Sequence, residues 1–364
     1  MTQIGQLRDH IRQLDEDILR LIAERMKAAT RIGERKKAAG IPLRDWNMER
    51  QVLDRAARQA AELGLAAPMA RSIMQMLIAA ARLEQERTSF STYRGSAESI
   101  LLIGGRGKMG RWFADFFGNQ GHRVTVHDPR GNGNGPPGAA DLEAALEGTS
   151  FALIAAPLDG VSSVLDDLAA RGYGGTVFDI ASLKGHLKPA IARARAANVA
   201  VTSIHPMFGP AARTLSDQVI CICDCGDAAA TRRVEAFFAD TAATLVRLSL
   251  EEHDEIVSYV LGLSHLTNLV FAKVLMESGR SYDELSRVAS TTFQSQMVTT
   301  ATVIRENPDL YYAIQHLNPF SSELCGTFQR AFEAISGWVR SGNRSAFTEM
   351  MQTGEKWMVG DDAG

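Results

Sequence analysis

The chain has 364 residues, of which 45% are hydrophobic and 22% charged, and its formal net charge is −3 at pH 7. This length predicts two or three domains, and the charge gives no overall attraction to nucleic acid or to an anionic membrane. We find no signal-peptide pattern and no apolar stretch of about 18 residues, which favours a cytoplasmic protein that acts on small molecules.

Residues 1–88 have the pattern of an all-helical domain. Apolar residues recur at helical spacing over 7–32, and no glycine interrupts them, which predicts one long amphipathic helix. A second helix is expected to begin near residue 45, and a third is expected over 67–87. The polar stretch 89–98, which lacks periodicity, is interpreted as a linker.

After residue 98, short apolar runs alternate with helical patterns up to residue 250. The predicted strands are SILLIGG, HRVTVHD, FALIAAP, GTVFDIA and VAVTSIH. This alternation is typical of a parallel sheet with crossover helices, so we predict a doubly wound, Rossmann-like α/β domain over 99–250. Residues 251–364 return to long helical patterns, at 251–278, 283–305 and 308–339, which predict a second all-helical domain.

A glycine motif joins the first predicted strand to a helix. Gly105, Gly107 and Gly110 form G-x-G-x-x-G directly after SILLIG and directly before RWFADFF. Glycines at these positions permit a tight turn, close approach of a pyrophosphate and close packing of helix on strand, while the helix N-terminus faces the phosphates. The residues expected to bind a dinucleotide therefore include the whole stretch, with Lys108 and Met109.

The second strand supports that interpretation over a simple flexible turn. HRVTVHD ends in Asp128, about twenty residues after the glycines, where a carboxylate can accept a hydrogen bond from the adenosine ribose and repel a 2′-phosphate. The sequence therefore predicts NAD as the cofactor. Arg130 leaves NADP as the alternative. Pro157, which follows the third strand, is a further expected cofactor contact.

A hydride transfer to a nicotinamide needs a group that takes the proton released by the substrate. His205 in SIHPMFGP is the candidate because it ends a predicted strand, at the edge where such sheets bind ligands. Ser182 in DIASLKG ends another strand and can hydrogen-bond both cofactor and substrate. The alternative for His205 is a histidine that simply caps a loop.

Three cysteines alternate in the run QVICICDC: Cys221, Cys223 and Cys225. A zinc site would need a fourth ligand that the run does not supply. We therefore interpret these cysteines as small apolar residues of a strand, and we expect no metal.

These motifs also carry a resemblance to a known family. VFDIASLKG, HPMFGP, GKMGRWF, EEHDE and NPDLYY resemble prephenate dehydrogenase, and the preceding helical module resembles the AroQ class of chorismate mutase. The order of the two modules and the length of the chain are similar to those of the bifunctional chorismate mutase/prephenate dehydrogenases. These enzymes act after the shikimate pathway, in the biosynthesis of tyrosine, an aromatic amino acid. The resemblance covers nearly the whole chain.

The resemblance implies a homodimer in which the last helical domain dimerises. In the implied dehydrogenase reaction, NAD takes a hydride from ring C4 of prephenate, the ring carboxylate leaves as carbon dioxide, and 4-hydroxyphenylpyruvate forms. His205 is implied to hydrogen-bond the C4 hydroxyl, Ser182 to orient that hydroxyl and the cofactor, and His265 in LSHL to lie near the nicotinamide. Without the resemblance, His265 would be interpreted as a structural histidine on a helix face.

The implied mutase reaction converts chorismate to prephenate and needs a compact conformer and positive charge around a dianion. Arg25 and Lys36 are eleven residues apart, which places them on one helix face, about 16 Å apart along the axis. Arg8 lies about 25 Å before Arg25 and points elsewhere, so a second chain must supply it to the same ligand. An entwined dimer, as in AroQ mutases, fits this inference.

Three further mutase residues follow from the resemblance alone. Asp45 and Glu49 match the residues that meet the C4 hydroxyl, and Gln85 matches the residue at the ether oxygen. The alternative for the cations is a solvated helix face, which we favour for Arg31 and Arg35 and, without the resemblance, would favour for Arg25 as well.

The sequence departs from the family pattern where an arginine or serine is expected, at Met48, Ala81, Gln294 and Thr302. Loss of a charge-assisted contact costs about 1.5–3 kcal/mol, or ten- to a hundredfold in affinity. Arg305, one turn beyond Thr302, is the candidate replacement for a substrate carboxylate, and Arg50 is the candidate near Met48.

Two alternatives follow. The same two reactions could act on 4-amino-4-deoxychorismate and 4-amino-4-deoxyprephenate and give 4-aminophenylpyruvate, since Asp45 and Glu49 suit an ammonium group. Those compounds keep both carboxylates, so an amine does not explain the lost arginines. In a non-catalytic alternative, degenerate sites bind pathway metabolites and regulate a partner. The intact glycine motif, Lys36, Ser182 and His205 argue against it.

Overall fold

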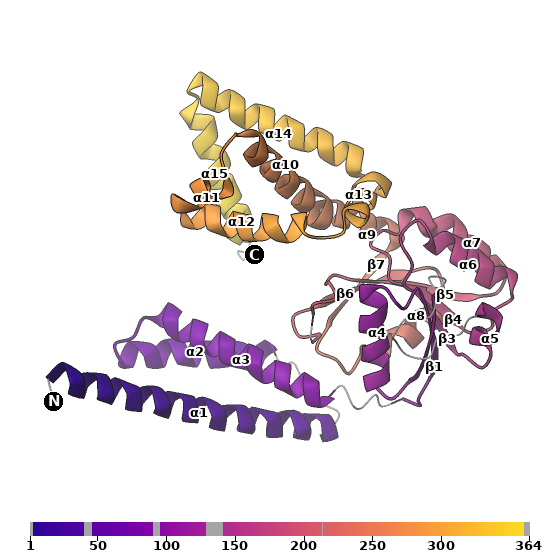
Figure 1. Cartoon of the computed structure of the whole chain (residues 1–364), viewed down its shortest axis with the longest axis horizontal. Helices are drawn as coiled ribbons and strands as arrows, with labels where there is room; N and C mark the ends of the chain where they lie inside the picture. Colours follow the sequence, from indigo (N-terminus) through magenta and orange to yellow (C-terminus); the bar gives the residue numbers. More distant parts are fainter. Residues whose placement is uncertain (1–2, 40–45, 90–94, 129–140, 213, 360–364) are drawn as a thin grey trace. The chain divides into compact units, whose positions relative to one another are not determined.

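The computed structural model describes residues 3–39, 46–89, 95–128, 141–212 and 214–359 (Figure 1). The chain divides into two compact units. The first comprises Met1–Ser182 and Leu187–Ser249, and the second comprises Leu183–His186 and Leu250–Gly364. A short piece of the loop after a central strand thus belongs to the helical second unit.

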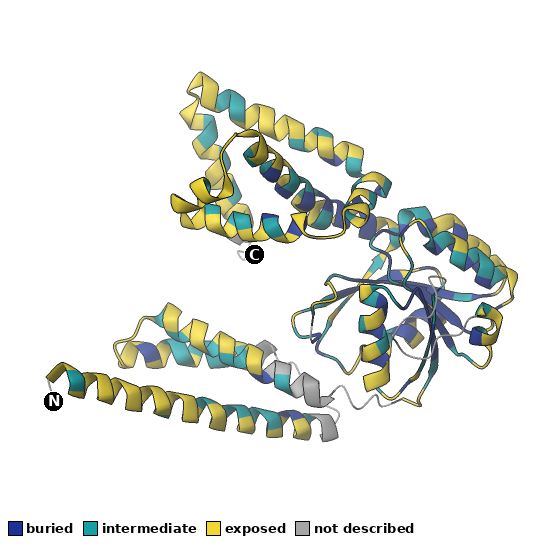
Figure 2. Ribbon diagram, viewed as in Figure 1, coloured by how far each residue is buried: buried dark blue, intermediate teal, exposed yellow. Residues whose placement is uncertain are grey.

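The chain begins with three helices, α1 (Gln3–Ala39), α2 (Trp46–Glu62) and α3 (Ala67–Ser89). Helix α3 packs against both α1 and α2. The apolar stripe of α1 that the spacing predicts does form, but within one chain it stays open, because Ile4, Leu7, Ile11, Leu14 and Ile18 are 47–62% exposed (Figure 2). Such a continuous apolar stripe is the kind of surface that another helix covers.

The α/β fold expected after residue 98 is confirmed as a seven-stranded sheet of order β2-β1-β3-β4-β5-β6-β7. All pairs are parallel except β5 with β6. The strands are β1 (Ser99–Ile103), β2 (Arg123–His127), β3 (Phe151–Ile154), β4 (Thr176–Asp179), β5 (Ala200–Pro206), β6 (Val219–Asp224) and β7 (Thr244–Ser249). Strand β7 was not expected from the sequence. Its residues TLVRLS are mostly exposed, and a strand that is mostly exposed does not need the apolar run that marks a buried strand.

Helices connect most of the strands, as in a doubly wound sheet. They are α4 (Lys108–Asn119), α5 (Leu142–Leu146), α6 (Val161–Ala170), η1 (Gly185–Leu187), α7 (Lys188–Ala196) and α8 (Ala228–Glu235). Along β1, the side chains of Ile100 and Leu102 belong to one apolar cluster, while those of Leu101 and Ile103 are buried outside it. Successive side chains of a strand point to opposite faces of the sheet, so β1 is covered on both faces.

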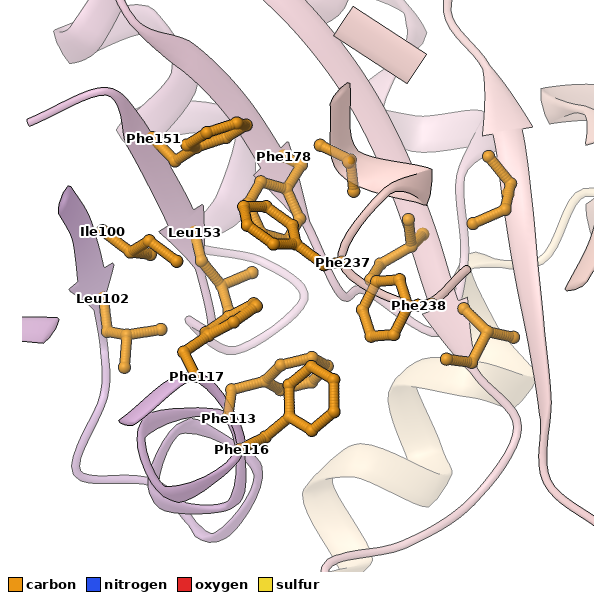
Figure 3. Packing of buried hydrophobic residues seen from close by; sticks show 14 of the residues in the cluster. Ile100, Leu102, Phe113, Phe116, Phe117, Phe151, Leu153, Phe178, Phe237 and Phe238 are labelled. Atoms are coloured by element: carbon orange, nitrogen blue, oxygen red, sulfur yellow. The ribbon is translucent and has the colours of Figure 1, made fainter. Parts of the chain in front are cut away.

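The core beneath α4 is rich in phenylalanine (Figure 3). Phe113, Phe116 and Phe117 of α4 pack towards Phe237 and Phe238, which follow α8. Because Phe113, Phe116 and Phe117 are fully or almost fully buried, this cluster fixes α4 against the sheet. The position of the glycine motif therefore depends on a well-packed core.

The second unit is helical, as expected. It contains α9 (Leu250–Val257), the π-helical turn η2 (Ser258–Leu263), α10 (Ser264–Glu277), α11 (Tyr282–Arg287), α12 (Thr291–Ile304), α13 (Pro308–Leu317), α14 (Ser321–Ser341) and α15 (Arg344–Val359). The single helices expected over 283–305 and 308–339 were wrong, since each divides in two. Ser290 caps α12 through the Phe293 N–H, and the side chain of Asn318 bonds the Phe320 N–H between α13 and α14.

The expectation of no apolar stretch of membrane-spanning length was also wrong. Among the described residues, the helical run Leu250–Glu277 is long and apolar enough by length and composition, and an 18-residue window within it has a mean hydropathy of 1.4. A helix from the core of a soluble protein passes the same test. This run carries His265 and Asn268, both buried within its own unit.

Candidate active sites

The glycine motif forms the turn between β1 and α4. Gly107 is the N-cap of α4. A Cβ on Gly110 would lie 2.6 Å from the Cα of Gly105, and one on Gly105 would lie 2.9 Å from Val126 of β2. The glycines at 105 and 110 thus allow backbone to pack on backbone and on the sheet.

Sequence reasoning assigned the tight turn to Gly105, but the structure assigns it to Gly104. Gly104 has φ +82°, and a Cβ there would lie 2.7 Å from the carbonyl oxygen of Ala155. Gly107 differs from the other glycines of the turn, because a Cβ added to it would meet no atom closer than the Gly104 oxygen, at 3.5 Å. Space for a ligand to approach the backbone is therefore left at Gly107, at the positive end of α4.

Asp128 lies beside the same turn. Its Oδ2 accepts a hydrogen bond from the Arg106 N–H at 3.2 Å, so the carboxylate that follows β2 is held at the glycine loop. The strand register aligns Ile103 with His127 and with Ile154, and Ile154 with Asp179. The carboxyl ends of β2, β1, β3 and β4 therefore share one edge, where ligands bind in such sheets.

The other predicted cofactor residues follow these strand ends. Lys108 and Met109 open α4, with Lys108 exposed and Met109 packed against the apolar cluster. Pro157 is exposed after β3, and its carbonyl accepts a hydrogen bond from the Gly160 N–H at 2.9 Å. Arg130 lies outside the described residues.

His205 occupies the penultimate position of β5. Its imidazole is 4% exposed, and its backbone pairs with Cys221 of the antiparallel strand β6. The following loop is tied down, because the Met207 N–H donates to the Val219 oxygen at 2.9 Å and the Trp112 indole donates to the Ala212 oxygen at 2.6 Å. His205 is therefore a buried histidine on a rigid element at the carboxyl end of the sheet.

Ser182 lies in the loop between β4 and η1 and is half-buried. The loop begins with a local bond, in which Asp179 Oδ1 accepts from the Ala181 N–H at 2.9 Å. Strands β4 and β5 are neighbours, so Ser182 follows the strand beside the one that carries His205.

In the second unit, His265 is the second residue of α10, which follows the π-helical turn η2 directly. Its ring stacks on Tyr311 of α13, with centroids 4.1 Å apart, and burial lowers the pKa of its imidazole. Its Nδ1 is buried without a hydrogen-bond partner among the described residues. A buried ring nitrogen in that condition is suited to a ligand's polar group.

The three residues of α12 discussed from the sequence are exposed. Gln294 and Thr302 lie on the helix, and Arg305 is its C-cap. The hydroxyl of Thr302 bonds only within its own helix in the described contacts, to the Val298 oxygen at 3.1 Å.

In the first helical module, Arg25 is partly buried. Its guanidinium donates to the Leu77 carbonyl of α3 at 3.1 Å, and burial lowers its pKa. Lys36 is half-buried near the C-terminal end of α1, and Arg8 is exposed near its N-terminal end. Arg25 is thus turned towards α3, the helix that carries Gln85.

The remaining mutase residues lie on α2 and α3. Glu49 is half-buried in the first turn of α2, beside the exposed Met48. Ala81 is buried in α3. Asp45 lies outside the described residues, and for Gln85 the description is limited to its place in α3.

Cys221 and Cys223 of β6 and the following Cys225 are buried and reduced, as small strand residues would be. Within the described parts of the chain, no three His, Cys, Asp or Glu side chains gather as a metal site would require.

Comparisons with known proteins match the helical parts at both ends of the chain. A family model for chorismate mutase type II matches residues 7–86, and one for the prephenate dehydrogenase dimerization domain matches residues 249–353. The T-protein of Enterobacter agglomerans is 25% identical over 369 residues, covering 100% of this chain and 95% of that protein. The T-protein of Haemophilus influenzae is 19% identical over 361 residues, covering 98% and 93%.

Among solved structures, prephenate dehydrogenase from A. aeolicus, in complex with hydroxyphenyl propionate and NAD+, has a TM-score of 0.59 at 15% identity. The likeness covers 73% of this chain and 99% of that one, and it shows a shared fold. The sheet and the helical domain after it thus have the fold of a prephenate dehydrogenase, and a chorismate mutase module of type II precedes them. One chain thus carries a chorismate mutase type II module followed by a prephenate dehydrogenase dimerization domain, and over nearly its whole length it is similar to the T-proteins.

Proposed function

We propose that the protein is a bifunctional enzyme that rearranges chorismate to prephenate and oxidatively decarboxylates prephenate to 4-hydroxyphenylpyruvate with NAD. The observation that carries the proposal is the presence of both modules in one chain, in the same order as in full-length relatives. We further infer a cytoplasmic location, since the reactions serve biosynthesis of an aromatic amino acid. The amino-substituted substrates are not favoured.

The glycine turn fits a dinucleotide. A Cβ at Gly107 would fill the space at the N-terminus of α4, and Asp128 is held beside the turn by the Arg106 N–H. A carboxylate there accepts hydrogen bonds from the ribose hydroxyls of NAD and repels the 2′-phosphate of NADP, which favours NAD. When bound, NAD supplies the hydride acceptor.

The proposed dehydrogenase chemistry assigns a proton to His205. The imidazole accepts a hydrogen bond from the C4 hydroxyl of prephenate and takes its proton as the hydride and carbon dioxide leave. The same proton then returns to the phenolate oxygen, so that 4-hydroxyphenylpyruvate forms, and Ser182 orients this oxygen throughout. Burial keeps the His205 ring in one position on β5. His265, whose lowered pKa keeps it neutral near pH 7, offers an uncharged ring nitrogen to the reacting groups.

The proposed mutase chemistry is electrostatic. Chorismate rearranges without covalent catalysis, so Arg25 and Lys36 act by holding the dianion in a compact conformer. The Leu77 carbonyl fixes the direction of the Arg25 guanidinium. Glu49, Asp45 and Gln85 complete the proposed site.

A homodimer explains two exposed apolar surfaces. The stripe of α1 is open in the single chain, and only 22% of the apolar window in Leu250–Glu277 is buried there. The second surface falls within the matched dimerization domain. We infer that a second copy covers both and that its Arg8 completes the mutase site.

Mixed dimers test that inference. Arg8→Ala and Arg25→Ala chains are each expected to lose mutase activity ten- to a hundredfold, because each lacks a charge-assisted contact. A heterodimer of the two, co-expressed with different tags and purified on both, has one site with both arginines. It is expected to recover about half the wild-type activity. An equally prepared Arg8→Ala/Arg8→Ala pair is the control, and no recovery in the heterodimer would show that Arg8 acts within its own chain.

Arg305 is the proposed replacement for the arginine that the family carries at Thr302. An Arg305→Ala enzyme is expected to show a ten- to a hundredfold higher KM for prephenate, because a carboxylate loses its cation. Steady-state NADH formation measures this. Arg280→Ala, at another exposed arginine of the same unit, is the control, and an unchanged KM in Arg305→Ala would refute the assignment.

The function itself is tested by NADH formation from prephenate and from 4-amino-4-deoxyprephenate in one buffer, with mutase activity on chorismate measured beside it. A higher kcat/KM for prephenate is the expected result. A preference of tenfold or more for the amino compound would keep the chemistry but change the pathway. Absence of turnover together with NAD binding would favour a non-catalytic regulator.

A further inference from the structure

Asp254 on α9 holds the loop that follows β4. Its Oδ1 accepts a hydrogen bond from the Lys184 N–H at 2.8 Å, and its Oδ2 accepts one from the Gly185 N–H at 2.6 Å. The Nδ1 of His253 lies 2.8 Å from Oδ1. One carboxylate thus joins two consecutive backbone amides, about 70 residues away in sequence, to the first helix of the second unit.

This arrangement is fully enclosed. The side chains of Asp254 and His253 are 1% and 0% exposed, and Leu183 and Lys184 are 0% exposed. Burial opposes the negative charge of Asp254, but the bonds from His253, Gly185 and Lys184 outweigh it, so the pKa of this carboxyl lies below its usual range. Asp254 is therefore ionised at neutral pH. Its carboxylate oxygens accept stronger hydrogen bonds in this charged form than in the neutral form.

Two further details fit the contact closely. A Cβ on Gly185 would lie 2.9 Å from Asp254 Oδ2, so the absence of a side chain there permits the approach. The Asn318 side chain donates to the Asp254 carbonyl oxygen at 2.9 Å, which fixes the backbone of α9 at the same point.

We propose that Asp254 is a positioning residue for the dehydrogenase reaction, which sets the place of Ser182 through the backbone of residues 183–185. The inference rests on the proposed function, in which Ser182 orients the reacting hydroxyl and the cofactor. Ser182 lies two residues before the first amide that Asp254 binds. Loss of one acceptor loosens the loop, and displacement of a positioned group by about 1 Å is enough to lower a rate a hundredfold.

The test is a double-mutant cycle with Asp254→Asn and Ser182→Ala. Asparagine keeps the size of the side chain but offers one acceptor oxygen in place of two. Asp254→Asn is expected to lower dehydrogenase kcat tenfold or more in the wild-type background, and less than about threefold when Ser182 is already alanine. The Kd of NAD and the mutase activity are expected to stay within about twofold, since neither depends on the Ser182 hydroxyl alone.

Ser258→Ala is the matched control. It removes a hydrogen bond of another buried side chain one turn further along, from the Ser258 hydroxyl to the Glu255 oxygen, and leaves residues 183–185 untouched. Unchanged kcat is expected for it. If Asp254→Asn does not fold, Asn318→Ala takes its place, because it removes only the bond to the Asp254 carbonyl. The same coupling to Ser182 is then expected, at a smaller size.

Equal losses from Asp254→Asn with and without the Ser182 hydroxyl would overturn the inference, as would a similar loss in Ser258→Ala. A wild-type enzyme that does not oxidise prephenate would instead refute the proposed function, before any variant is compared.

Discussion

Replacement of His205 by asparagine is expected to lower the dehydrogenase kcat by about 10²- to 10⁴-fold, which is the usual contribution of a positioned acid–base group. The mutase activity of the same preparation is expected to be unchanged. Asparagine can still hydrogen-bond at this buried position of β5, but it cannot take a proton near neutral pH. The measurement is steady-state NADH formation at saturating prephenate and NAD.

His122→Asn is a matched control for the His205 variant. His122 is also a buried histidine of the sheet unit, 5% exposed, but it lies just before β2, and its Nδ1 accepts from the Glu98 N–H at 3.0 Å. The amino ends of the strands lie opposite the proposed site. His122→Asn is expected to lower the melting temperature without a comparable fall in kcat. Comparable falls in both variants would mean that His205 serves the fold alone.

The second large effect is expected from Gly107→Ala. Gly107 has φ −61°, which alanine adopts freely, and the nearest atom to its Cβ would be 3.5 Å away. The fold therefore accommodates the methyl group, which occupies the space where a pyrophosphate meets the backbone. Loss of a charge-assisted contact corresponds to about ten- to a hundredfold in the Kd of NAD. Fluorescence titration with NAD measures the Kd, and a melting curve checks the fold.

Alanine variants of two other glycines serve as controls for Gly107→Ala. Gly118→Ala, in the same helix with open space around it, is expected to leave the Kd unchanged and to raise the melting temperature slightly, because alanine favours the helix over glycine. Gly110→Ala is expected to lower both affinity and stability, because its Cβ would meet the backbone of Gly105 at 2.6 Å. If Gly107→Ala binds NAD as tightly as Gly118→Ala, the dinucleotide does not approach α4 at this point.

Local patterns predicted much of this fold because local forces determine them. The strand before the glycine motif, the helix after it and the acid at the end of β2 all follow from apolar spacing and glycine conformation. The division between α11 and α12 could not be predicted in this way, since Val288 and Ala289 continue the apolar pattern until Ser290 caps the next helix. Strand β7 was missed because it lies at the edge of the sheet and is largely exposed.

The site divides along the same line. His205, Ser182 and the glycines could be proposed as site residues because each lies within or shortly after a recognisable strand. Gly104 was missed as the turn residue, because neither its positive φ nor the closeness of Ala155, which follows β3, is visible in the local sequence. Asp254 carried no local signal of its role, since its partners at Lys184 and Gly185 are distant in sequence.

The membership of Leu183–His186 in the helical unit has an evolutionary consequence. A gene fragment that ends after Ser249 would encode every strand of the sheet, yet it would leave the amides of Lys184 and Gly185 without the carboxylate that accepts from them. A recombination event at that boundary would therefore break this contact. We expect the nucleotide-binding and helical segments to be exchanged between relatives together.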